Sequence, residues 1–128
     1  MPEYGFSIRI ARFKDPQNKD RWLILKIERD TLGDTWVQFK FSLSSLPVSI
    51  EEKRKMAEPL YGIYIEEKKN EFIVSTWWHR VGVPSDFTFA MNNSVLKTYV
   101  KFFRLCGLDL SFESLKKIIE RIEFLSKI

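Results

Sequence analysis

Residues 71–90, which read EFIVSTWWHRVGVPSDFTFA, carry the strongest strand-forming signal in the chain. Because β-branched and aromatic side chains suit a pleated, half-buried surface, residues 72–79 are predicted to form a strand. Successive side chains of a strand point to opposite faces, so Trp77 and His79 share one face and Trp78 takes the other. One of the two adjacent tryptophans is therefore expected to lie outside the core.

The residues before this run predict further strands separated by short turns. Strands are expected at residues 5–13, 21–29, 36–43, 60–65 and 72–79, and residues 87–89 form either a sixth short strand or an extended loop. The first three alternate between apolar and polar side chains, which indicates an antiparallel meander. The last two long strands are expected to form a hairpin around the charged turn at 66–70.

Helical signals occupy one middle segment and the C-terminal part of the chain. Ser49-Ile-Glu-Glu52 has the pattern of a capping box and predicts a short helix over about 50–58. A second helix is capped by Asn92, Asn93 or Ser94 and runs to about Leu105, with Gly107 just past its end as a C-cap. The third helix begins after a cap at Asp109 or Ser111.

The expected fold is a single α+β domain over residues 1–128. It has an antiparallel sheet of about five strands, a meander plus a hairpin, with a short middle helix and two C-terminal helices packed on one face. Leu115, Ile118, Ile122 and Leu125 form an apolar stripe on the third helix. This stripe favours packing of the helix on the sheet. The same stripe is also the expected surface of a homodimer, if one forms.

The composition is that of a globular protein, with 45% hydrophobic and 30% charged residues and 15% aromatics. Cys106 is the only cysteine, so no intrachain disulfide is possible and a reducing compartment is favoured. The N-terminal residues lack the layout of a secretion signal, and no run reaches the roughly 20 apolar residues of a membrane span. A cytoplasmic protein without a membrane partner is expected.

The amide-bearing residues are scarce, with two Gln and four Asn in the chain, whereas Lys and Glu are abundant. This bias favours a thermophilic source.

Most kinds of catalytic site lack their residues. One His and one Cys cannot supply the three or four ligands of a zinc site, and no phosphate-binding glycine loop or Gly-x-Ser-x-Gly elbow is present. No metal or other cofactor is therefore expected. A Glu-x-Lys element at residues 66–69 resembles the one used by metal-dependent nucleases of the PD-(D/E)xK class. No Pro-Asp pair lies at a suitable distance upstream, however, and the composition of 66–69 favours a solvated hairpin tip.

The remaining constellation lies on the predicted outer face of the sheet, where aromatic and basic side chains alternate. Its members are Arg9, Trp22, Lys26, Trp36, Gln38, Lys40, Trp77 and His79. The net charge is +4, and residues 91–107 add Lys97, Lys101 and Arg104 without any acidic residue. Proteins that bind single-stranded nucleic acid stack bases on aromatic rings and follow the phosphates with cations.

The sequence thus favours a small non-enzymatic protein that binds nucleic acid, preferably single-stranded DNA or RNA. The alternative is a protein–protein interaction module, an inhibitor or an assembly subunit, that uses the same aromatic face as a hot-spot patch. The rings could instead be covered by the C-terminal helices in a three-layer domain, or buried in a dimer. A metal-dependent nuclease is the least favoured alternative.

Overall fold

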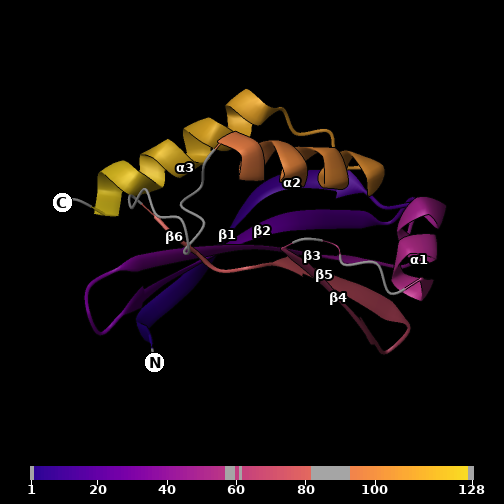
Figure 1. The fold of residues 1–128 in the computed structure, drawn as a ribbon, viewed down its shortest axis with the longest axis horizontal. Helices are drawn as coiled ribbons and strands as arrows, with labels where there is room; N and C mark the ends of the chain where they lie inside the picture. The colour runs from indigo at the N-terminus through magenta and orange to yellow at the C-terminus, as the bar shows by residue number, and fades with distance from the viewer. Residues whose placement is uncertain (1, 57–59, 61, 82–92, 127–128) are drawn as a thin grey trace.

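The computed structural model describes residues 2–56, 60, 62–81 and 93–126. The described strands are β1 (Pro2–Lys14), β2 (Asp20–Asp30), β3 (Thr35–Leu43), β4 (Ile63–Lys68), β5 (Glu71–Thr76) and β6 (His79–Arg80). The described helices are α1 (Val48–Lys55), α2 (Asn93–Leu105) and α3 (Phe112–Ser126). Figure 1 shows α2 and α3 lying on the same side of the sheet. The predicted short strand at 87–89 lies outside the described residues.

The strands form one antiparallel sheet in the order β1-β2-β3-β5-β4, and β6 pairs with the first residues of β3. The meander of β1, β2 and β3 and the hairpin of β4 and β5 are both present, so the predicted α+β fold is confirmed. Strand β3 lies at the centre of the sheet, where it joins the meander to the hairpin.

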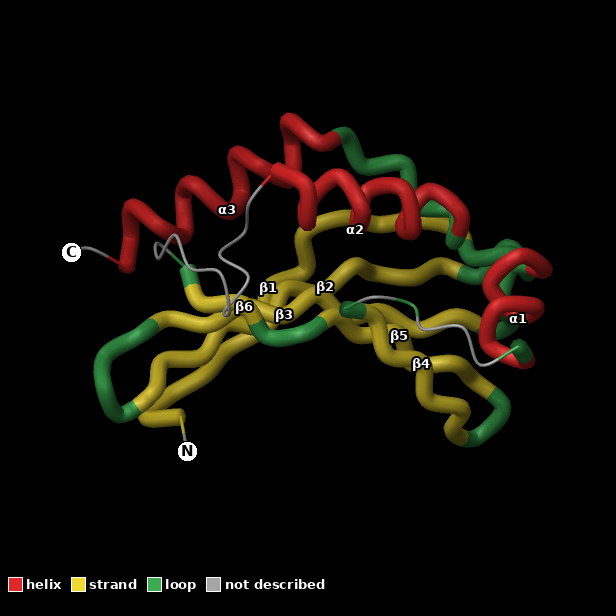
Figure 2. The backbone as a smooth tube through the Cα atoms, in the orientation of Figure 1, coloured by secondary structure: helices red, strands yellow, loops and turns green. Residues whose placement is uncertain are grey.

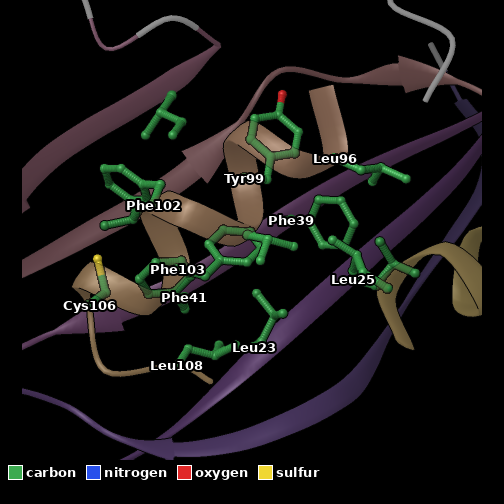
Figure 3. Close-up of a cluster of buried hydrophobic side chains, with 14 of the residues drawn as sticks. Leu23, Leu25, Phe39, Phe41, Leu96, Tyr99, Phe102, Phe103, Cys106 and Leu108 are labelled. Atoms are coloured by element: carbon green, nitrogen blue, oxygen red, sulfur yellow. The ribbon is translucent and has the colours of Figure 1, made fainter. Parts of the chain in front are cut away.

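The core lies between the sheet and the two C-terminal helices, α2 and α3. Alternate residues of β3, among them Val37, Phe39 and Phe41, are buried, as the pattern of the sequence predicts. The ring of Phe39 is fully buried, and its centroid lies 6.0 Å from that of Tyr99 and 5.8 Å from that of Phe103, both on α2. Phe39 meets both rings edge to face, and Figure 3 shows the three side chains together over the sheet.

The ends of the C-terminal helices follow local signals. Helix α2 ends at Leu105, and Gly107, just beyond it, adopts a φ of +97° and donates its N–H to the carbonyl of Arg104. The hydroxyl of Ser111 accepts a hydrogen bond from the backbone N–H of Ser114 at 3.1 Å, so Ser111 rather than Asp109 caps α3. Both ends confirm the prediction.

The capping box predicted at Ser49 is wrong. Helix α1 begins at Val48, its N-cap is Pro47, and no side chain caps it. The carbonyl of Pro47 accepts the N–H groups of Ile50 and Glu51 at 3.0 Å, which places Ser49 inside the first turn. Pro47 has a φ of −55° and a ψ of 146°, and the helix begins directly after it, one residue before the predicted cap at Ser49.

The β4–β5 hairpin also differs from its predicted bounds. Strand β4 starts at Ile63 rather than at Leu60 and includes the charged residues up to Lys68. The turn is reduced to Lys69 and Asn70, which have φ values of 51° and 64°. Two consecutive residues with positive φ match the right-handed twist of a two-residue hairpin, which explains the tight turn.

A buried carboxylate fastens the β1–β2 turn to the end of β3. Asp15 accepts the backbone N–H groups of Gln17, Lys19 and Ser44, each at 2.9 Å, together with the Ser44 hydroxyl. The guanidinium Nε of Arg21 lies 3.1 Å from its second oxygen. Burial alone would raise the pKa of Asp15, but the hydrogen bonds from Ser44, Lys19 and Arg21 outweigh it and hold this pKa well below its usual range.

Candidate nucleic-acid interface

We call the side of the sheet that faces away from α2 and α3 the outer face. The strand register sets Arg9, Ile24, Lys40, Ser75 and Tyr64 in one row across β1, β2, β3, β5 and β4. Their sequence neighbours on β2 and β3 are buried under the helices, so this row belongs to the opposite side. In Figure 2 the β2–β3 turn and the β4–β5 hairpin bend away from the helix layer, so the sheet arches around the outer face.

No described helix covers the outer face. The core rings of β3 contact α2 on the other side of the sheet, and Figure 1 shows both C-terminal helices there. Within the described ranges, the three-layer arrangement considered from the sequence is therefore not formed.

Two tryptophans of the outer face each have a cation beside the ring. Trp22 on β2 is 36% exposed, and the guanidinium carbon of Arg9 lies 5.4 Å from its ring centroid. The ammonium nitrogen of Lys26 lies 5.8 Å from the ring of Trp78. Both distances are those of cation–π contacts. The rings and the positive charges thus lie side by side.

Trp36 is half-buried and is tied to the β2–β3 turn. Its indole Nε1 donates to a carboxylate oxygen of Asp30 at 2.8 Å, and this bond lowers the pKa of Asp30. The other oxygen of Asp30 accepts the N–H groups of Leu32 and Asp34. Trp36 therefore stabilises the turn in addition to lying on the outer face.

A β-bulge sets the direction of the two adjacent tryptophans. Lys40 pairs with Ser75 and Val37 pairs with His79, so two residues of β3 lie opposite three residues, 76–78. The extra residue shifts the alternation by one. Trp77 packs against Tyr64 with 6.5 Å between ring centroids, while Trp78 lies beside Lys26. Both tryptophans consequently lie on the outer face.

The bulge also corrects the prediction for His79. This residue was expected on the outer face with Trp77, and that prediction is wrong, because His79 is fully buried on the helix side. Its Nε2 lies 2.6 Å from the Tyr99 hydroxyl of α2. The extra residue of the bulge turns the side chain of His79 into the core, so it is no part of the candidate interface.

Thr76 supplies the hydrogen bond that the bulge removes from the ladder. Its hydroxyl accepts the backbone N–H of Phe39 at 3.0 Å, and its own carbonyl accepts the amide of Gln38 at 3.0 Å. Thr76 is buried, so an unpaired N–H here would lack access to water. The side chains of Thr76 and Gln38, on neighbouring strands, thus stabilise the bulge from both faces of the sheet.

The basic residues of α2 do not join the outer face. Lys97, Lys101 and Arg104 are exposed on the helix layer, on the opposite side of the sheet. The ammonium of Lys97 lies 5.4 Å from the ring of Phe112, and Arg104 lies 3.7 Å from Asp109. The sequence grouped these cations with the tryptophans, whereas the structure separates them into two surfaces.

Three cations of the outer face have no acidic partner in the part of the chain that the structure describes. Arg9, Lys26 and Lys40 form no ion pair with any described residue, whereas Arg12 pairs with Asp20 at 3.1 Å. A cation without an intramolecular partner can approach an external anion without first breaking a salt bridge. The outer face therefore joins aromatic rings with available positive charge.

Sequence reasoning missed two aromatic members of this surface. Tyr64 is 57% exposed beside Trp77, and its position between the inward Ile63 and Ile65 is a signal that could have placed it. An uninterrupted strand predicts Trp78 on the face opposite Trp77, and the structure places both on the outer face. No local signal marks the bulge that turns it outward.

Other kinds of site find little support in the described part of the chain. It holds no group of three His, Cys, Asp or Glu side chains placed to bind a metal ion. Cys106 is fully buried, and burial raises its pKa to about 12, which opposes formation of a reactive thiolate. None of the described helices is both long enough and apolar enough to cross a membrane.

Comparison of the chain with protein-family models, with curated proteins and with solved structures found no match.

Proposed function

We propose that the protein binds single-stranded nucleic acid on the outer face of its sheet, without catalysing a reaction. The observation that carries this proposal is the alternation of partly exposed rings with Arg9, Lys26 and Lys40, none of which has an acidic partner in the described structure. Bases stack on such rings whatever their sequence, because every base has a π-face. The cations then neutralise phosphates along the same strand.

Single-stranded ligands are favoured over duplex because of the rings. Trp22 and Tyr64 present aromatic surface to solvent, and stacking on it requires an unpaired base. Duplex binding by phosphate contacts alone would leave these rings unused. A clear preference for single strands over a duplex of equal length is therefore expected.

A protein ligand is the alternative, and Ile24 favours it, because this apolar side chain lies in the central row of the outer face between Arg9 and Lys40. A patch of this kind could serve as a hot spot. Salt distinguishes the two functions. Binding to phosphates weakens steeply with salt, whereas an aromatic protein interface changes little.

The test is a titration with oligonucleotides monitored by tryptophan fluorescence at low and at moderate salt. Stacking should quench the fluorescence, and salt should release the ligand. Trp22→Ala should weaken binding by about 1–3 kcal/mol, since an exposed ring supports the ligand more than the core. Lys40→Gln should reduce the slope of log K against log salt by about one.

Lys101→Gln provides the matched control, because it removes one exposed cation on the helix layer. It should leave both affinity and slope nearly unchanged. Absence of quenching at low salt, or equal losses for Lys40→Gln and Lys101→Gln, would contradict a nucleic-acid site on the outer face. The interaction-module function would then be preferred.

A further inference from the structure

A second candidate site lies on the helix side of the sheet. A pocket of about 500 Å³ lies between strands β1 and β2 and the middle of α3. Phe6 and Ile8 on β1 line it and are 50% and 41% exposed, although they pair with the buried Ile27 and Leu25. These two side chains thus share the apolar side of the sheet, yet they remain open to solvent.

The pocket has apolar walls. Ile27 and Ile118 line it together with the two exposed β1 side chains, and Thr35 adds one hydroxyl. Its volume lies in the range of about 300–1,000 Å³ that small-molecule sites occupy. A ligand that fills it must therefore be largely apolar, since a polar ring system would find few hydrogen-bond partners on these walls.

Every charged side chain among the described lining residues is basic. These side chains are Arg29 on β2 and Lys117 and Arg121 on α3. Lys117 and Arg121 are exposed and stand one helical turn apart, so both charges can reach the same anion. Arg29 donates its Nε–H to the carbonyl of Gly33 at 3.2 Å, and its terminal nitrogens have no hydrogen-bond partner among the described residues.

None of these three cations forms an ion pair with a described acidic residue. Positive charge that no described acidic side chain neutralises, at the edge of an apolar pocket, matches an anion on an apolar chain. A carboxylate suits the cluster, because a guanidinium can donate two parallel hydrogen bonds to it.

We propose that this pocket binds a medium-chain fatty acid, with the chain against Phe6, Ile8 and Ile118 and the carboxylate near Lys117 and Arg121. The site is independent of the proposed nucleic-acid interface, since the two lie on opposite sides of the sheet. Filling one site should leave the other accessible.

The test uses dodecanoate, below the concentration at which it forms micelles, and calorimetry on the full chain. One dodecanoate should bind per chain. It should bind roughly tenfold tighter than dodecanol, which has the same chain without the charge. The double variant Lys117→Gln with Arg121→Gln should lose this preference and bind the two ligands alike.

Lys97→Gln with Lys101→Gln is the matched control, because these two residues are also exposed and one turn apart on a helix but do not line the pocket. It should retain the preference. Ile8→Gln, at a half-exposed wall position, should weaken both ligands and test the apolar wall without removing a fully buried side chain.

Three results would overturn the proposal. Absence of dodecanoate binding would show that the pocket takes no fatty acid, and equal affinities for dodecanoate and dodecanol would remove the role of the cations. Light scattering provides the third. The protein would be a dimer, Ile8→Gln would dissociate it, and dodecanoate would leave it intact. This result would identify a second copy of the chain as the occupant of the pocket.

Discussion

Replacing Asp15 by alanine should destabilise the protein strongly. The Asp15 side chain is fully buried, accepts hydrogen bonds from three backbone N–H groups and the Ser44 hydroxyl, and pairs with Arg21, which is itself only 14% exposed. Alanine at this position leaves several buried donors unsatisfied and takes away one of the two acidic partners of Arg21, which keeps Glu71 at 2.8 Å, so the change should cost about 3–5 kcal/mol. Stability totals about 5–15 kcal/mol in proteins of this kind, so the loss is a large fraction of it.

The same carboxylate predicts the pH dependence of stability. The pKa of Asp15 is lower in the folded protein than in the unfolded chain, so its contribution is complete above about pH 3.9, the unfolded value. It is lost as the pH falls towards the folded pKa, at about 1.4 kcal/mol per pH unit. The gap in unfolding free energy between wild type and Asp15→Ala should therefore shrink in acid.

Urea unfolding followed by tryptophan fluorescence at neutral and acid pH measures both effects. Asp109→Ala is the control, because this carboxylate is 94% exposed and lies 3.7 Å from Arg104, where an ion pair contributes at most about 1 kcal/mol. A loss below about 1 kcal/mol for Asp15→Ala would refute the structural role of Asp15. The same conclusion would follow if the difference in unfolding free energy between wild type and Asp15→Ala stayed constant as the pH falls.

Three further changes test the core and the backbone. Phe39→Ala removes a fully buried ring and should cost about 3–5 kcal/mol in urea unfolding; a loss below about 1 kcal/mol would place this ring outside the core. Gly107→Ala should cost more than about 1 kcal/mol and lower the thermal midpoint, because its φ is +97° and a Cβ would lie 2.5 Å from the carbonyl oxygen of Lys14; an unchanged midpoint would contradict this geometry. Thr76→Val should cost about 1–3 kcal/mol by leaving the N–H of Phe39 without a partner, whereas Thr76→Ser should retain the hydrogen bond, and equal losses for both would exclude it.

Local signals predicted most of the fold. The alternation of Val37, Phe39 and Phe41 depends only on the period of a strand, and the structure buries these three residues. Gly107 and Ser111 end and begin helices through their own backbone and side-chain geometry. Signals of this kind require no knowledge of partner strands, and for that reason they can be identified in the sequence.

The predictions failed at positions where pairing with a neighbouring strand determines which way a side chain points. Whether His79 faces inward depends on its pairing with Val37 across the sheet, and one extra residue in the bulge moves its side chain from the outer face to the core. No glycine marks this bulge, so the TWWH sequence looks like an uninterrupted strand. The separation of Lys97 and Lys101 from the tryptophans likewise depends on which side of the sheet α2 covers, and the strand pattern alone leaves that open.

The candidate interface is therefore built on a register shift in the sheet. With uninterrupted pairing, Trp77 and Trp78 would point to opposite faces, and one of these large rings would enter the core beside Phe39. The extra residue brings both to the outer face, and the core receives the smaller Thr76 and His79 instead. The hydroxyl of Thr76 replaces the missing ladder bond, and His79 contacts Tyr99, so the helix layer holds the bulge from inside. The rigidity of the two outer rings thus depends on core residues that no ligand on the outer face would touch.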